Sequence, residues 1–122
     1  MGLPTTFGDP LWKDNIAAGK AFLIDRLLQA GAIVFGKTNV PYILADAQSY
    51  NDIYGTTNNP WDLTRSPGGS SGGEAATLAA GLSGLGAGSD IAGSLRNPLP
   101  RRLSRCSADL RGRLQRYQIL RS

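Results

Sequence analysis

Residues 67–98 contain two glycine-rich turns on either side of an alanine-rich segment, and this pattern constrains the fold more than any other feature. The first turn holds Ser70 and the second holds Ser94. Alanine favours helix and has little bulk, so residues 74–82 are expected to form a helix that packs closely on its neighbours. Free backbone N–H groups at the start of such a helix, beside two hydroxyls, would suit an anion or an oxyanion.

Other segments predict a mixture of helices and strands. Apolar residues at helical spacing indicate a helix over residues 18–30, with Gly31 as its cap. The run Ala32-Ile33-Val34-Phe35 is typical of a buried strand. A short helix is expected near residues 42–47 and a small-residue strand over 85–88. A helix followed by a continuous apolar strand favours an α/β fold.

Composition bounds the size and chemistry of the protein. The chain has 122 residues, enough for one small domain. It has no histidine, which excludes a Ser-His pair and any histidine-ligated metal site within these residues. Cys106 is the single cysteine, which is typical of a cytoplasmic protein. No apolar run is long enough to span a membrane, and the first residues do not resemble a secretory signal.

The net charge of +4 is unevenly distributed. Residues 1–100 carry 6 basic and 8 acidic side chains, whereas residues 101–122 carry 7 arginines and one aspartate. A basic tail of this kind is one basis for binding nucleic acid, and that alternative stays open at this point. Its leucines also recur at the spacing of an amphipathic helix.

Several blocks of the chain, in order, resemble the amidase-signature family of serine amide hydrolases. They are Gly2-Leu3-Pro4-Thr5-Thr6 with Gly8, Gly36-Lys37-Thr38-Asn39, Gly55-Thr56-Thr57-Asn58-Asn59-Pro60 and the two serine turns. The resemblance covers residues 1–98, about a quarter of a typical domain of this family. It implies that the chain is a fragment of the amidase-signature fold, a mixed sheet with flanking helices, and that residues 99–122 form a separate basic tail.

The resemblance implies a specific chemistry. Ser94 would be the acylated nucleophile, and Ser70 the bridging serine, held on a cis peptide bond after Gly69. A neutral lysine would deprotonate Ser70, which would in turn deprotonate Ser94. The backbone N–H groups of Ile91, Ala92, Gly93 and Ser94 would receive the oxyanion. No metal and no organic cofactor would take part, and the substrate would be a small-molecule amide.

Other residues near the serines are expected to support the turns. Ser71 follows the bridging serine, and Asp90 and Arg96 are expected to hold the second turn through an ion pair. Ala92 departs from the family pattern, which has glycine there, so the turn tolerates it only if its φ stays negative.

The catalytic lysine is not matched by any lysine of the chain. Lys13 lies in a block similar to the family's, but it follows the block from Gly2 to Gly8, whereas the family's lysine precedes that block. The resemblance therefore places the lysine upstream of Met1, and we expect the 122-residue chain to be inactive on its own.

The tail after Asn97-Pro98 departs from the family pattern. Its arginine-rich composition suggests a gene read out of frame, because codons shifted by one position from Pro100 onward can spell residues similar to those of the family. The expected function is thus amide hydrolysis through a serine acyl-enzyme. The alternatives are a component of a tRNA-dependent amidotransferase, a module that binds nucleic acid through its tail, and a non-functional pseudogene product. The main interpretation expects neither a membrane nor a nucleic acid as partner.

Overall fold

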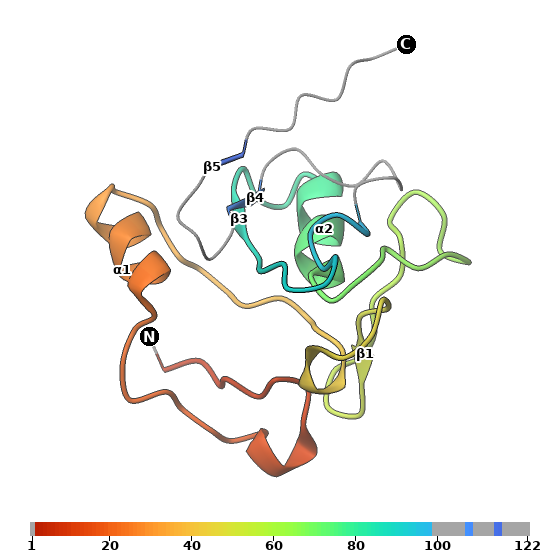
Figure 1. Ribbon diagram of the computed structural model, residues 1–122, viewed down its shortest axis with the longest axis horizontal. Coiled ribbons are helices and arrows are strands. Elements are labelled where there is room, and N and C mark those ends of the chain that lie inside the picture. The colour runs from red at the N-terminus through yellow and green to blue at the C-terminus, as the bar shows by residue number, and fades with distance from the viewer. Residues whose placement is uncertain (1, 99–106, 109–113, 116–122) are drawn as a thin grey trace.

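A computed structural model describes residues 2–98, 107–108 and 114–115. It contains the helices α1 (Phe22–Gln29) and α2 (Gly72–Ala79) and the 3-10 turns η1 (Pro10–Trp12) and η2 (Tyr42–Leu44). The strands are β1 (Tyr50–Asn51), β2 (Gly55–Thr56), β3 (Gly86–Ala87), β4 (Ser107–Ala108) and β5 (Leu114–Gln115). In Figure 1, α1 and α2 stand apart, and a long extended segment after α1 runs between them to the region of β1.

The short strands form two sheets. Antiparallel β1 and β2 make a hairpin in which Tyr50 pairs with Thr56. In the other sheet β3 is parallel to β4, and β4 is antiparallel to β5. The second sheet is therefore mixed, but β4 and β5 lie in the tail, outside residues 1–98 for which the amidase-signature fold is expected. The described residues thus contain both helices and small sheets, as an α/β chain does, and the full mixed sheet of the family stays an expectation. The predicted strand over residues 85–88 is confirmed, as β3.

Both helices end in the same way. The N–H of Gly31 bonds to the carbonyl of Leu28, and the N–H of Ala32 bonds to that of Leu27. Gly81 and Leu82 repeat this pattern on Leu78 and Thr77 after α2. Gly31 and Gly81 have φ of +86° and +72°, values that favour glycine. These Schellman motifs confirm the predicted cap at Gly31 and end α2 at Ala79, before the predicted limit at Leu82.

The buried strand predicted over residues 32–35 is wrong. The segment has no strand assignment, and the side chains of Ile33 and Phe35 are 87% and 70% exposed. A strand needs a neighbouring strand to accept its backbone hydrogen bonds, and within the described residues none lies beside this segment. The predicted helix over residues 42–47 is reduced to the single turn η2, because Ile43 and Leu44 take positive φ values.

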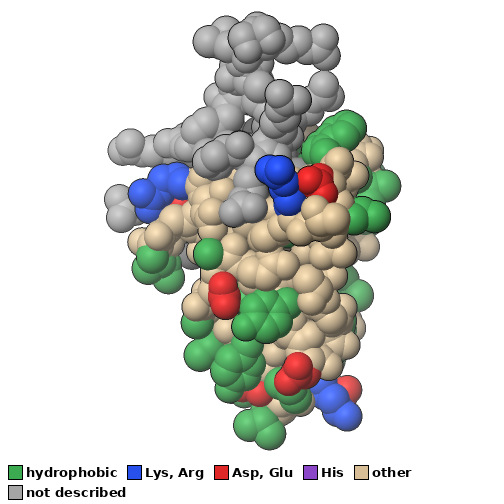
Figure 2. All heavy atoms as spheres, turned by 90° about the vertical axis from the view of Figure 1, so that its right-hand side faces the viewer, with side chains coloured by type: hydrophobic (Ala, Val, Ile, Leu, Met, Phe, Trp, Pro, Cys, Tyr) green, Lys and Arg blue, Asp and Glu red, His purple; other side chains and the backbone are tan. Residues whose placement is uncertain are grey.

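The interior of the described part is small and largely polar. Its buried hydrophobic residues are Ala75 and Leu78, both on α2. The other buried residues include serine, asparagine, threonine and proline side chains: Thr6, Pro41, Ser49, Asn51, Asn59, Pro67, Ser70, Ser71 and Pro98. Figure 2 shows apolar side chains spread over the surface of one face instead. Hydrogen bonds therefore hold together much of the region that positions the site.

Candidate active site

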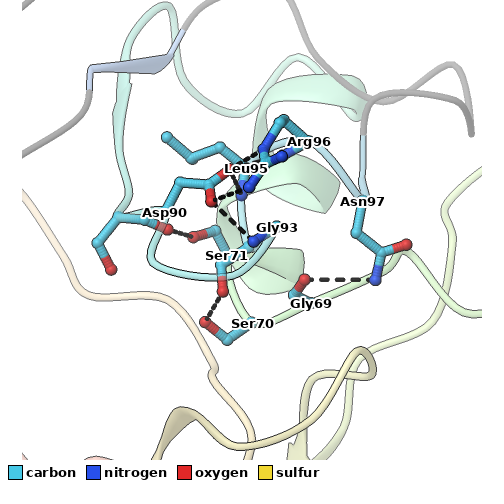
Figure 3. Close-up of polar contacts among 10 residues, drawn as sticks. Gly69, Ser70, Ser71, Asp90, Gly93, Leu95, Arg96 and Asn97 are labelled. Carbon is cyan, nitrogen blue, oxygen red and sulfur yellow. Dashed lines mark hydrogen bonds and ion pairs between the residues drawn. The ribbon is translucent and has the colours of Figure 1, made fainter.

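Ser70 and Ser94 meet at the start of α2. Ser70 directly precedes Ser71, the N-cap residue of the helix, and Ser94 lies in the turn that follows β3. Their Oγ atoms are hydrogen-bonded at 2.8 Å (Figure 3). Ser70 is buried and Ser94 is half-buried. Because a hydroxyl both donates and accepts, a proton can lie on either side of this contact.

The backbone around Ser70 is closely enclosed. The Gly69–Ser70 peptide bond is cis, as the sequence resemblance implies. A side chain at Gly69 would come within 2.8 Å of the backbone of Asp46, Ala47 and Gln48, so the position requires glycine. The Asn97 amide donates to the carbonyl of Gly69 at 3.4 Å, and the Ser71 N–H donates to the carbonyl of Ser94 at 3.3 Å. The second of these bonds joins the two serine turns directly.

Asp90 organises the turn that carries Ser94. Its carboxylate accepts hydrogen bonds from the N–H groups of Gly93, Leu95 and Arg96, and the Arg96 guanidinium binds both of its oxygens at 3.0 Å. The predicted ion pair between Asp90 and Arg96 is present. Hydrogen bonding to Arg96, with the backbone N–H groups, holds the pKa of Asp90 well below its usual range.

The four backbone N–H groups expected to receive an oxyanion differ in their surroundings. The N–H of Gly93 is engaged with Asp90 Oδ1 at 2.7 Å. Within the described residues, the N–H groups of Ile91, Ala92 and Ser94 have no acceptor. Ala92 is not among the residues with positive φ, so its methyl group fits the turn. Gly93 has φ of +128° and supplies the conformation that other residues avoid.

Ser71 and Glu74 connect the site to its surroundings. The hydroxyl of Ser71 donates to the carbonyl of Ser89 at 3.4 Å, which links the start of α2 to the segment after β3. Glu74, in the first turn of α2, accepts a hydrogen bond from Thr38 Oγ1 at 3.4 Å. Burial raises the pKa of the Glu74 carboxyl, and the hydrogen bond from Thr38 opposes that shift.

None of the three lysines, all of which lie in the described part of the chain, hydrogen-bonds to either serine. Lys37 Nζ donates to the carbonyls of Leu3 and Pro4 and to Thr5 Oγ1, so it ties the N-terminal segment to the segment after α1. Lys13 ends η1 and is exposed, and Lys20 is exposed before α1. Lys37 therefore makes structural contacts, in keeping with the prediction that no lysine of the chain is the catalytic one.

The sequence did not reveal the polar side chains that hold the Ser70 turn. Ser49, just before β1, is fully buried and hydrogen-bonds to Gly72 and to the Ser70 carbonyl. Asn97 reaches the carbonyls of both Ala47 and Gly69. Asn39 and Asn51 join the same region through a 2.6 Å amide contact. No local pattern identifies these contacts, because each of them joins residues 12 or more positions apart along the chain.

Further observations concern metal binding, membrane spans and the basic tail. The described residues contain no group of three or more histidine, cysteine, aspartate or glutamate side chains placed to hold a metal ion. None of the helices in the same residues has the length and apolar character required to cross a membrane. The arginine-rich tail, on which the nucleic-acid alternative depends, lies largely outside the described residues, at 99–106, 109–113 and 116–122.

The described residues thus bring two serine hydroxyls into contact beside a turn with free backbone N–H groups. The sequence profile of the amidase family matches residues 1–99. The chain therefore belongs to the amidase family, and the resemblance seen in its motifs is confirmed.

Curated relatives show which enzymes contain this segment. An acylamidase from Rhodococcus erythropolis is 54% identical over 97 residues, which are 80% of this chain and 20% of that enzyme. A glutamyl-tRNA(Gln) amidotransferase subunit from Methanosarcina barkeri is 45% identical over 98 residues, or 80% of this chain and 21% of that protein. The chain thus spans about a fifth of the length of the curated relatives it matches.

Solved structures match part of the same segment. A glutamyl-tRNA(Gln) amidotransferase subunit from Thermotoga maritima matches with a TM-score of 0.64 at 34% identity, over 67% of this chain and 18% of that one. A 6-aminohexanoate cyclic dimer hydrolase, solved with its substrate, matches with a TM-score of 0.54 at 43% identity. That match covers 55% of this chain and 14% of the hydrolase. Both likenesses rest on part of a much longer chain.

Proposed function

We propose that this chain carries the nucleophilic part of an amidase, which hydrolyses a carboxylic amide through an acyl-enzyme on Ser94. The observation that carries the proposal is the 2.8 Å contact between the Oγ atoms of Ser70 and Ser94. A serine hydroxyl is a weak nucleophile until a neighbour accepts its proton, and Ser70 is the neighbour in reach. The family membership supports the same assignment.

The proposed reaction begins when Ser94 Oγ attacks the amide carbon. A C–O bond forms, the proton of Ser94 passes to Ser70, and the proton of Ser70 passes to a neutral lysine. As the intermediate collapses, the C–N bond breaks and the leaving nitrogen takes a proton back through Ser70. Water then attacks the ester by the same relay, and the carboxylic acid leaves with Ser94 restored.

The turn before Ser94 would stabilise the charge that develops on the carbonyl oxygen. The N–H groups of Ile91, Ala92 and Ser94 support this role because they have no acceptor within the described residues. The Gly93 N–H instead supports the shape of the turn through its bond to Asp90. Preorganised donors of this kind contribute about 3–4 kcal/mol each to transition-state stabilisation.

The sequence identities favour an amide hydrolase over a tRNA-dependent amidotransferase. The acylamidase is 54% identical to this chain, compared with 45% for the Methanosarcina barkeri amidotransferase subunit. Both proteins contain a similar segment, so a tRNA-dependent amidotransferase is the second candidate.

The base of the proposed relay is a lysine outside the 122 residues. Lys37 is already engaged by three oxygen atoms, and Lys13 and Lys20, both described by the structure, make no hydrogen bond to the serines. Losing one member of a catalytic triad costs on the order of 10⁴–10⁶ in rate. We therefore propose that the 122-residue chain alone hydrolyses no amide above background.

A chimera tests the proposal. The matching 97-residue segment of the Rhodococcus acylamidase is replaced by that of this chain, so that the remainder of the enzyme supplies the base. We expect hydrolysis of acylamidase substrates and labelling of Ser94 by a fluorophosphonate probe. Ser94→Ala should abolish both, and Ser70→Ala should lower the rate by about 10⁴ or more.

The matched control is Ser83→Ala, because Ser83 is a loop serine whose hydroxyl bonds within its own turn. It should leave activity and labelling unchanged. Labelling that survives Ser94→Ala in a folded chimera would disprove the nucleophile assignment. Labelling of the unmodified 122-residue chain at Ser94 would show that the base lies within it, and Lys13→Ala would then identify it.

A further inference from the structure

The Ser49 side chain contacts the segment around Ser70 from a distant part of the chain. It is fully buried and lies immediately before β1. Its Oγ accepts a hydrogen bond from the Gly72 N–H at 2.9 Å, and it lies 3.2 Å from the carbonyl oxygen of Ser70 and 3.4 Å from that of Gly68. One hydroxyl has one proton to donate and lone pairs to accept, so it can accept from Gly72 while it donates to Ser70, the shorter of its two carbonyl contacts.

The N–H of Gly72 needs an outside partner. Gly72 is the first residue of α2, and the first N–H groups of a helix have no acceptor within it. The N-cap residue Ser71 makes no side-chain cap, since its hydroxyl donates instead to Ser89. Ser49 thus caps the helix from a distant segment. A side chain at Gly72 would come within 2.5 Å of Ser49 Oγ, so this approach also requires glycine.

Ser49 is itself firmly placed. Its carbonyl accepts the Thr57 N–H at 2.9 Å, which holds it to the β1–β2 hairpin, where Tyr50 pairs with Thr56. The carbonyl of Ser70 and the N–H of Gly72 are therefore both anchored to this hairpin through one hydroxyl. The Ser70 hydroxyl, on the residue whose carbonyl is one of these anchors, contacts Ser94 Oγ at 2.8 Å.

We infer that Ser49 is a positioning residue, which sets the direction of Ser70 Oγ toward Ser94 by holding the backbone next to Ser70. The inference rests on the proposed function for its catalytic consequence. Its structural content, that the Ser49 hydroxyl holds Gly72 and Ser70 together, is tested separately. A small displacement of a relay group lowers reaction rates strongly, so the effect should reach the chemistry.

The first measurement uses amide hydrogen exchange in the full 122-residue chain. Ser49→Ala removes the acceptor of the Gly72 N–H, so exchange at Gly72 should become about tenfold faster or more. Ser49→Thr keeps the hydroxyl and should restore protection. The amide of Ile53, which bonds to Asn51, should stay unchanged in both variants and so report that the rest of the fold is intact.

The second measurement uses the chimera and the fluorophosphonate probe. Ser49→Ala should lower the labelling rate of Ser94 at saturating probe, while the probe concentration for half-maximal rate stays the same. Ser49→Thr should recover the rate. A chimera with native Ser49 that is not labelled would disprove the proposed function and leave the exchange result to decide the structural claim.

Some outcomes would overturn the inference. If Gly72 exchanges as fast in the unmodified chain as in Ser49→Ala, the hydroxyl does not hold the helix start. If Ser49→Ala does not fold, Ser49→Cys replaces it, because a thiol keeps the shape and is a weak acceptor. Wild-type protection of Gly72 and wild-type labelling in Ser49→Cys would then refute the role of the hydroxyl.

Discussion

At the scale of single residues, one carboxylate shapes the turn of the nucleophile. Asp90 accepts three backbone hydrogen bonds and both contacts of Arg96, so its charge is stabilised more in the folded chain than in an unfolded one. The lowered pKa of Asp90 expresses this difference. A carboxylate with a lowered pKa stabilises the fold at any pH above the pKa that it has in the unfolded chain. This stabilisation is lost as the pH falls from that value through the lower pKa of the folded chain.

Asp90→Asn therefore has a pH-dependent effect. At pH 7 the variant should be less stable by on the order of 1–3 kcal/mol, because hydrogen bonds to a charged acceptor are lost. The difference in unfolding free energy between the variant and the unmodified chain should narrow as the pH falls below about 4. In that range the carboxyl group of the unfolded chain takes up a proton, which lowers the stability of the unmodified protein. Urea unfolding at pH 7 and pH 3 measures the two values.

The control for this experiment is Asp52→Asn, an exposed carboxylate in the β1–β2 turn. It should change stability little at either pH. A destabilisation by Asp90→Asn that is equal at pH 7 and pH 3 would show that shape, and not charge, is what Asp90 contributes.

At the scale of elements, α2 is placed by close backbone contact. A Cβ atom at Gly73 would lie 2.5 Å from the backbone nitrogen of Asn39, which belongs to the extended segment between α1 and η2. The alanines of α2 suit the same close packing, and Ala75 is buried. Two serine turns can meet at 2.8 Å because small residues let the helix start approach its neighbours.

The substitution Gly73→Ala tests whether helix propensity or packing has the larger effect on stability at this position. In an isolated helix alanine is more favourable than glycine by about 1 kcal/mol. At Gly73 the added methyl meets backbone that cannot move aside cheaply, so we expect a net destabilisation of about 1–3 kcal/mol. Thermal unfolding, monitored by circular dichroism, shows whether the substitution raises or lowers stability.

Gly84→Ala is the matched control, because a Cβ there meets nothing within 4 Å and its φ is not positive. This substitution should change the unfolding free energy very little. A stabilising Gly73→Ala would mean that helix propensity outweighs the contact with Asn39.

At the scale of the whole molecule, apolar surface exceeds apolar core. Ile33, Phe35, Leu11 and Ile91 are 70–90% exposed, whereas the described residues bury the hydrophobic side chains Ala75 and Leu78. A groove of about 230 Å³, lined by Phe7, Asp9, Trp12 and Ile43, adds to this surface. Large exposed apolar patches favour association.

Replacing both Ile33 and Phe35 by threonine should therefore reduce self-association of the chain. Because both side chains are exposed, stability should change by less than about 0.5 kcal/mol. Light scattering over a concentration series measures association. Leu78→Ala serves as the contrast, since removing a buried side chain should lower stability by about 2–5 kcal/mol without relieving association. Unchanged association in the double variant would exclude this surface as its cause.

The gene offers a separate test at this scale. The family match ends at residue 99, and we propose that the basic tail after it is read out of frame. Resequencing the locus through codons 97–122 should show that the shifted frame continues with amidase-like residues. Stop codons and unrelated sequence in that frame would contradict the proposal.

The order of residues along the chain was enough to identify the family, the pair of serine turns and the cap at Gly31. Gly31 acts through local backbone conformation, and the serine blocks are contiguous, so short stretches of sequence specify them. The contacts among distant segments became visible only in the folded chain, where Ser49 meets a partner 23 positions away and Asn97 one 50 positions away. The strand predicted over residues 32–35 failed for the same reason: a strand exists only where another supplies its hydrogen bonds, and the pattern of one segment carries no information about its neighbour.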